Sequence, residues 1–158
     1  AFLAFARGEA TEAPVPADVA ALVGQAVEDA RRAGQAVDWV PPMPVVLPVR
    51  ADALGRAVAN LLGNAARHAA RAAVSVQVSD RFVRIVVEDD GPGIPRDRRD
   101  EAMRPFTRLD AARNPNRGGG VGLGLAIAAD VARAHGGSLR LGDSDRLGGL
   151  RAELAILR

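Results

Sequence analysis

The chain of 158 residues contains no cysteine, no tyrosine and no lysine. The lack of cysteine excludes a disulfide framework and a thiolate metal site. The lack of lysine excludes a Walker-type phosphate loop, whose pattern requires that residue. All the basic residues are therefore arginine, and the formal net charge is only +2. Any phosphate or metal chemistry must use other groups.

Aromatic residues and long apolar runs are also scarce. Aromatics make up 3% of the chain and its arginines are scattered, whereas a nucleic-acid binder usually interleaves a basic stripe with aromatics. The longest mainly apolar run, residues 121–132, contains Asp130 and is too short to cross a bilayer. Hydrophobic residues make up 48%, enough for one buried core. We expect one globular domain with no nucleic-acid partner and no membrane contact of its own.

Hydrophobic periodicity divides the chain into helices and paired strands. Asp18 is a suitable N-cap for a helix that stops at Gly34. Residues 51–70 carry the clearest helical stripe, formed by Leu54, Ala57, Val58, Leu61, Leu62 and Ala65. Strand patterns occupy residues 37–40, 45–49, 72–80, 81–90, 137–143 and 148–157. This order predicts an α+β two-layer sandwich, a mixed and mostly antiparallel sheet of about five strands with three helices on one face.

The ends and the middle of the chain suggest its organisation. The chain starts at Ala1, and "AFLAFARGE" looks like the end of a helix, so we expect a piece of a longer protein. Residues 1–14 would be a preceding helix and its linker, and residues 15–158 the domain. Residues 95–119 show little apolar periodicity, and a long irregular loop is usually functional. We expect a mobile lid there, with one helical turn.

The helix at 51–70 carries polar residues along the edge of its apolar stripe. With Asn60 as origin, Asn64 lies at about +40°, Arg67 at about −20° and His68 at about +80°. Asparagine is a mediocre helix former, and its amide can ligate a hard cation or bond a phosphate. The line indicates the wall of a ligand cleft. Asparagines on an ordinary solvated face are the alternative.

Two glycine-containing segments accompany this helix. "EDDGPGIP", residues 88–95, ends a buried strand with carboxylates suited to a purine amine, although a simple turn is the alternative. "RGGGVGLGLA", residues 117–126, exposes backbone N–H groups just before a helix, which suits phosphate. The glycines follow a long loop instead of a strand, which argues against a dinucleotide fold. A flexible linker is the alternative for this second segment.

Together and in this order, these segments resemble the catalytic domain of histidine kinases, in the GHKL ATPase superfamily with the Bergerat fold. "NLLGNAARH" is similar to its N box, "DDGPG" to its G1 box, "RPFTR" to its F box and "GGVGLGLAIA" to its G2 box. The resemblance covers about residues 15–157 and looks closest to the EnvZ type of osmosensor kinase.

The resemblance implies a role for each matching residue. Asn64 would ligate Mg²⁺, with Asn60 and Arg67 or His68 near the phosphates of ATP. Asp89 would accept a hydrogen bond from the adenine amine, in a pocket shaped by Gly91, Gly93 and Ile94. The remaining implied contacts are Gly120, Val121, Gly122, Leu123 and Gly124 around the triphosphate, and Phe106 and Arg108 from the lid at 95–119. Many family members have lysine or tyrosine where this chain has Arg67 and His68, so this phosphate contact departs from the family pattern.

The implied function is that of the ATP-binding part of a cytoplasmic two-component sensor histidine kinase. It would donate the γ-phosphoryl group of Mg-ATP to a histidine on a neighbouring dimerisation domain, which would pass it to a response regulator. Residues 1–14 would then end the dimerisation-domain helix. The alternatives are an ATP-hydrolysing clamp of the gyrase, MutL and chaperone branch, and a nucleotide-binding module without transfer activity.

Three positions bear on the choice between these functions. The hydrolytic branch carries a glutamate four residues before its Mg²⁺ asparagine, where this chain has Asn60. The chain has two histidines, His68 and His135, and neither sits in a phosphoacceptor motif. We expect His135 to be structural, a cationic or donor side chain at a helix C-terminus.

Overall fold

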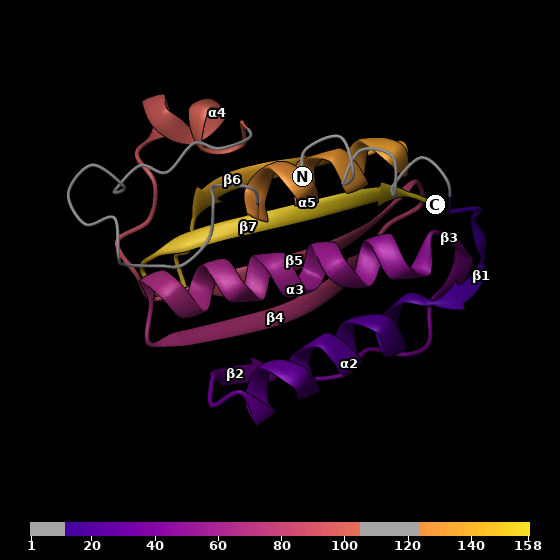
Figure 1. Ribbon diagram of the computed structural model, residues 1–158, viewed down its shortest axis with the longest axis horizontal. Coiled ribbons are helices and arrows are strands. Elements are labelled where there is room, and N and C mark those ends of the chain that lie inside the picture. The colour runs from indigo at the N-terminus through magenta and orange to yellow at the C-terminus, as the bar shows by residue number, and fades with distance from the viewer. Residues whose placement is uncertain (1–11, 105–123) are drawn as a thin grey trace.

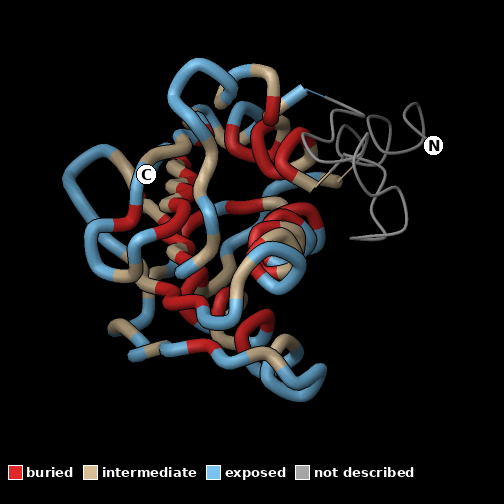
Figure 2. The backbone as a smooth tube through the Cα atoms, turned by 90° about the vertical axis from the view of Figure 1, so that its left-hand side faces the viewer, coloured by how far each residue is buried: buried red, intermediate tan, exposed pale blue. Residues whose placement is uncertain are grey.

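The computed structural model describes residues 12–104 and 124–158, which form two layers. A five-stranded sheet is one layer, and helices α2, α3 and α5 cover one of its faces (Figure 1). In the turned view the buried stretches gather in the interior (Figure 2). In chain order the elements are β1 (Val15–Asp18), α2 (Val19–Arg32), β2 (Ala36–Trp39), β3 (Val46–Val49), α3 (Ala51–His68), β4 (Arg71–Val78), β5 (Phe82–Asp89), the 3₁₀ turn η1 (Arg96–Arg98), α4 (Arg99–Ala102), α5 (Gly124–Ala134), β6 (Ser138–Asp143) and β7 (Leu150–Leu157).

The main sheet has the strand order β2-β4-β5-β7-β6. β2 runs parallel to β4, and the other neighbouring pairs are antiparallel. The register sets Asp89 at the end of β5 opposite Ala72 in β4. The predicted mixed, mostly antiparallel sheet is therefore confirmed, and its last two strands, β6 and β7, are antiparallel neighbours.

The core lies between the sheet and the three helices. In β5, Val83, Ile85 and Val87 face the helices, because alternate residues of a strand share a face. The predicted stripe of α3 is confirmed, since its buried residues are Ala53, Leu54, Ala57, Val58, Leu61, Leu62 and Ala65. α3 is the middle helix of the layer (Figure 1). No helix in residues 12–104 and 124–158 is long and apolar enough to span a membrane.

The ends of α2 lie where the local signals predict them. The Asp18 carboxylate accepts hydrogen bonds from the Ala20 N–H at 3.0 Å and from the Val45 N–H at 2.9 Å. The first bond is an N-cap, which satisfies an N–H left open at the start of the helix. Gly34 follows the C-cap residue with a φ of +97°, the left-handed conformation that ends many helices.

One element of the structure differs from the prediction. Residues 15–18, expected to be linker or helix start, form β1, which pairs with β3 and places Pro16 opposite Pro48. Both strands are edge strands of a two-stranded sheet, where proline is tolerated. α4 is the helical turn expected within residues 95–119, and it adds a fourth helix to the three predicted on the sheet; its Ala102 is buried. Residues 105–119 of the expected lid, with Phe106 and Arg108, lie outside the described residues.

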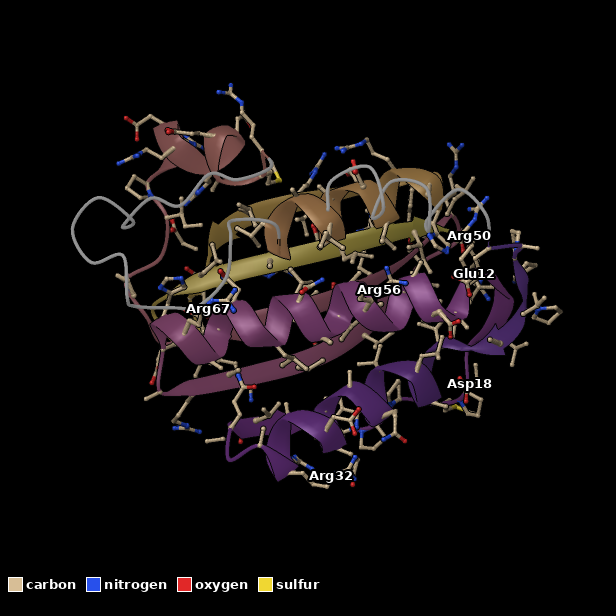
Figure 3. The ribbon with its side chains drawn as sticks, in the orientation of Figure 1. Glu12, Asp18, Arg32, Arg50, Arg56 and Arg67 are labelled. Carbon is tan, nitrogen blue, oxygen red and sulfur yellow. The ribbon has the colours of Figure 1, made fainter. Side chains whose placement is uncertain are left out.

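A group of three residues joins the start of the described chain to α3 and α5. The Glu12 carboxylate accepts hydrogen bonds from the N–H groups of Asp52 and Ala53 at the start of α3, at 2.8 and 3.0 Å. The Arg50 guanidinium donates to the carbonyl oxygens of Glu12 and Ala134, each at 2.9 Å. Figure 3 shows Glu12 and Arg50 together at this end of α3. We call Glu12, Arg50 and His135 the Glu12 clamp.

His135 completes the clamp through both of its ring nitrogens. Its Nε2 accepts the Arg50 backbone N–H at 3.0 Å, so the ring proton is assigned to Nδ1, which lies 2.8 Å from the Val131 carbonyl oxygen. The expected donor at the end of α5 is therefore present.

Candidate functional site

The polar line of α3 lies against the start of α5. A Cβ atom on Gly124, the first residue of α5, would lie 3.6 Å from Arg67 Nη2 and 3.7 Å from the Asn60 carbonyl oxygen. Asn60 and Asn64 are half-buried, whereas Arg67 and His68 are exposed. Figure 3 shows Arg67 towards the C-terminal end of α3. The structure thus brings the predicted site residues Asn60, Arg67 and Gly124 together.

The N-terminus of α5 and the Arg67 guanidinium are both positive, and no acidic side chain of the described chain pairs with either of them. The N-terminus of a helix carries a partial positive charge, and the first turn of α5 contains no acidic residue. Within residues 12–104 and 124–158 the Arg67 guanidinium makes no hydrogen bond or ion pair. A helix N-terminus beside an uncompensated guanidinium is suited to bind a phosphate group.

Asp89 lies at the end of β5 and is 4% exposed. Its Oδ1 accepts hydrogen bonds from the Gly91 N–H at 2.9 Å and from the Leu150 N–H at 3.1 Å. Its Oδ2 has no donor among the described residues. Because buried carboxylate oxygens are normally hydrogen-bonded, Oδ2 is suited to accept a hydrogen bond from a ligand.

Glycines let the chain approach this carboxylate closely. A Cβ on Gly91 would lie 2.5 Å from the carbonyl oxygen of His68, and His68 is the last residue of α3. Gly93 has a φ of +71°, a conformation that favours glycine. Both positions therefore favour glycine for backbone reasons, and their part in an adenine pocket stays a prediction. The contact between Gly91 and His68 also places the Asp89 loop at the same end of α3 as Arg67.

Gly149 is a site residue that the sequence did not reveal. It ends the loop between β6 and β7, and its N–H donates to the Asp89 carbonyl oxygen at 2.9 Å. A Cβ at this position would lie 2.4 Å from Asp89 Oδ1 and 2.6 Å from the Gly91 nitrogen. In the sequence, the pair Gly148-Gly149 indicates only a hairpin turn, and nothing there links it to a residue some sixty positions earlier.

Replacing Gly149 with alanine should therefore disturb Asp89. The added methyl group must displace the carboxylate or the loop, and such overpacking usually destabilises a protein by about 1–3 kcal/mol. We expect a lower melting temperature and at least about tenfold weaker ADP binding, measured by calorimetry. Gly142→Ala is the matched control, because a Cβ there meets nothing within 4 Å. A Gly149→Ala protein that binds ADP like the wild type would contradict this role.

Asp90 fastens the end of β5 to the start of β4. Its Oδ1 accepts the N–H groups of Ala70 and Arg71, both at 2.9 Å. The Arg71 N–H is the main cause that holds the pKa of Asp90 below its usual value, helped by the Ala70 N–H and the Arg71 charge. The exposed Asp90 is thus a scaffold residue, whereas its buried neighbour Asp89 faces the site.

This lowered pKa gives a pH-dependent contribution to stability. An acid whose folded pKa is depressed stabilises the fold above its unfolded pKa, about 4, and the contribution disappears as the pH falls through the folded pKa. We expect Asp90→Asn to be less stable than the wild type at neutral pH, with the difference shrinking in acid. Urea unfolding over a pH series tests this. Asp80→Asn, in the exposed turn after β4, should follow the wild type throughout.

The residues present fit ATP with Mg²⁺. Asp89 Oδ2 can accept a hydrogen bond from an amine, and the N-terminus of α5 beside Arg67 can bind phosphates. Within the described ranges no group of three or more His, Cys, Asp or Glu side chains could hold a metal. Mg²⁺ keeps several waters and is commonly held by one or two protein ligands plus substrate phosphates, so the single amide oxygen of Asn64 fits it. The predicted contacts Gly120, Val121, Gly122 and Leu123 lie outside the described residues.

Ile94 is the last predicted pocket residue in the described chain. It is partly buried and packs against the core, and its carbonyl oxygen accepts the Arg99 Nε–H at 3.0 Å. Arg99 in turn pairs with Asp143 at 2.8 Å, which ties α4 to the end of β6. Ile94 therefore connects the predicted adenine pocket to Arg99, the first residue of α4.

Comparisons with known proteins agree with this geometry. Residues 49–157 match the family described as "Histidine kinase-, DNA gyrase B-, and HSP90-like ATPase". The chain is 38% identical over 135 residues to the probable sensor histidine kinase TcrY of Mycobacterium tuberculosis, which covers 82% of this chain and 28% of that protein. It is 40% identical over 112 residues to the sensor histidine kinase CpxA of Escherichia coli, covering 70% and 24%. The chain spans about a quarter of the length of these relatives.

Solved structures give the same result. The ATP binding domain of PrrB from Mycobacterium tuberculosis superposes with a TM-score of 0.76 at 30% identity, covering 91% of this chain and 96% of that one. The histidine kinase domain of the Escherichia coli osmosensor EnvZ superposes with a TM-score of 0.64 at 33% identity, covering 90% and 87%. The predicted fold class and the predicted resemblance are both confirmed.

Proposed function

We propose a function from the family to which this chain belongs, the histidine kinase-, DNA gyrase B- and HSP90-like ATPases. In this proposal the chain binds Mg-ATP and donates the γ-phosphoryl group to a histidine on a separate dimerisation domain. The chain is similar to the catalytic ATP-binding domains of sensor histidine kinases, which supports ATP binding and a part in two-component signalling. The transfer step, its acceptor and a response regulator as the final recipient are proposals. We place this reaction in the cytoplasm.

The observation that carries the proposal is the Oδ2 atom of the buried Asp89, which accepts no hydrogen bond from the residues that the structure describes. Two backbone N–H groups hold Oδ1, so the carboxylate is fixed and Oδ2 is left to accept a hydrogen bond from a ligand. The exocyclic amine of adenine is such a donor, whereas guanine has a carbonyl oxygen at the same ring position. The site should therefore prefer adenine nucleotides to guanine nucleotides.

The other end of the site would hold the phosphates. We assign phosphate contacts to Arg67 or His68 and to the backbone at the start of α5, with Asn60 beside them. Asn64 would ligate Mg²⁺, which when bound neutralises charge on the phosphates. The chain's own contribution is then to position the nucleotide and to present its γ-phosphoryl group in line with an acceptor from outside.

A hydrolytic clamp is the second candidate function, because the matched family also includes gyrase and HSP90-like ATPases. The residue four positions before Asn64 decides between the two. It is Asn60, whose amide has no useful basicity, so nothing at that position can take a proton from an attacking water. The nucleotide-binding module without transfer activity would share the site but not the transfer.

A nucleotide titration tests the proposal directly. We expect ATP and ADP to bind to the purified chain with 1:1 stoichiometry, and ATP to bind more tightly with Mg²⁺ than with a chelator present. Calorimetry measures both affinities. Absence of ATP binding under all these conditions would overturn the proposed function.

A further inference from the structure

Two polar side chains are buried in the described part of the chain, and both lie at one end of the sheet. They are Asp89 and Ser144, which are 4% and 3% exposed. Asp89 belongs to the proposed adenine site. Ser144 is the first residue of the loop that joins β6 to β7, where a serine would ordinarily be exposed to solvent. A buried polar side chain needs a reason.

Ser144 closes the loop that contacts Asp89. Its N–H donates to the Gly149 carbonyl oxygen at 2.8 Å, and its carbonyl oxygen accepts the Gly148 N–H at 2.7 Å. Its Oγ accepts the Leu147 N–H at 2.9 Å. One residue therefore holds both ends of the six-residue loop 144–149 together.

The same hydroxyl fastens the loop to β5. Ser144 Oγ donates to Glu88 Oε1 at 3.1 Å. Glu88 and Asp89 are consecutive residues of β5, so their side chains point to opposite faces of the sheet. Glu88 thus holds the loop through Ser144 on one face, and Asp89 is held by Gly149 and Leu150 on the other.

From this arrangement we infer that Ser144 is a positioning residue for adenine recognition. It fixes the loop so that the Leu150 N–H meets Asp89 Oδ1, which turns Oδ2 towards the nucleotide. The inference rests on the proposed function, since it assumes that Asp89 binds adenine. It goes further in assigning part of base selectivity to a residue that does not touch the base.

The test compares affinity and base selectivity in matched variants. Ser144→Ala removes both Oγ bonds and should weaken ATP binding about tenfold, with GTP binding changed less, so that the ATP-to-GTP affinity ratio falls. Glu88→Ala removes the same link from the other side and should have a similar effect. In the double variant the two effects should not add, because both break one connection. Calorimetry supplies the affinities and thermal unfolding the stabilities.

Ser79→Ala is the matched control. Ser79 makes comparable bonds to the Phe82 N–H and to the Phe82 carbonyl oxygen, but in the hairpin turn between β4 and β5. It should change stability without changing the ATP-to-GTP ratio. If Ser144→Ala does not fold, Glu88→Ala decides the question with Ser144 still in place.

The outcomes separate this inference from the proposed function. A lower melting temperature with unchanged ATP affinity and unchanged selectivity in Ser144→Ala and Glu88→Ala would overturn the positioning role and leave the proposed function intact. A wild-type chain that does not bind ATP would overturn the proposed function and this inference with it.

Discussion

Asp89→Asn is expected to weaken ATP and ADP binding alike by at least about tenfold while the fold stays intact. The asparagine keeps a carbonyl oxygen for the Gly91 and Leu150 N–H groups, so the internal bonds survive. It replaces Oδ2 with an NH₂ group, which cannot accept a hydrogen bond from the adenine amine. Leaving such a buried partner unpaired costs about 1–3 kcal/mol, or more where charge is involved.

The change should also alter base selectivity. The wild type should prefer ATP to GTP, and Asp89→Asn should reduce that preference because the new NH₂ can donate to the guanine carbonyl oxygen. Asp89→Ala should lose affinity as well, together with the bonds that hold the loop. Asp90→Ala is the matched control, since Asp90 is exposed and bonds the backbone of Ala70 and Arg71. Equal affinity of the wild type for ATP and GTP would rule out the adenine assignment.

The isolated chain is expected to bind ATP but to hydrolyse it very slowly. A positioned general base contributes typically about 10²–10⁴-fold to a rate, and the amide of Asn60 cannot serve as one. The chain should not phosphorylate itself either. His135 uses both ring nitrogens in hydrogen bonds with Arg50 and Val131, and His68 belongs to the proposed phosphate end of the site.

Adding a dimerisation domain that contains an acceptor histidine should produce acid-labile phosphorylation of that partner. Asn64→Ala or Asn64→Asp should abolish or sharply reduce it, because the proposed Mg²⁺ ligand is lost. Gln25→Ala, an exposed amide on α2, should leave transfer unchanged. Labelling with γ-³²P-ATP followed by acid treatment measures the product. Brisk ATP turnover by the isolated chain, or labelling of His68, would favour the hydrolytic clamp.

Local signals in the sequence predicted most of the helices and strands. Asp18 and Gly34 mark the ends of α2 because capping and left-handed glycine are properties of a few adjacent residues. The stripe of α3 is equally local, and so are the turn glycines near Asp89. The strand pairs joined by short turns follow for the same reason.

Contacts between distant segments could not be predicted in this way. The strand β1 exists only because it pairs with β3, and its prolines argue against a strand when read alone. The donors that hold Asp89 include Leu150, which is 61 positions away. Nothing in the turn sequence distinguishes Ser144 from an exposed loop serine. Such roles depend on strand register, which hydrophobic pattern alone does not fix between separated strands.

The Glu12 clamp connects the start of the described chain to α3, the helix that carries several of the proposed site residues. Glu12 caps α3 at its first turn, and α3 is a continuous helix of 18 residues, about 27 Å long, whose far half carries Asn60, Asn64 and Arg67. It packs between α2 and α5. We expect a displacement of Glu12 along the axis of α3 to shift the proposed phosphate end of the site. Pulling Glu12 away would instead leave the Asp52 and Ala53 N–H groups without their acceptor.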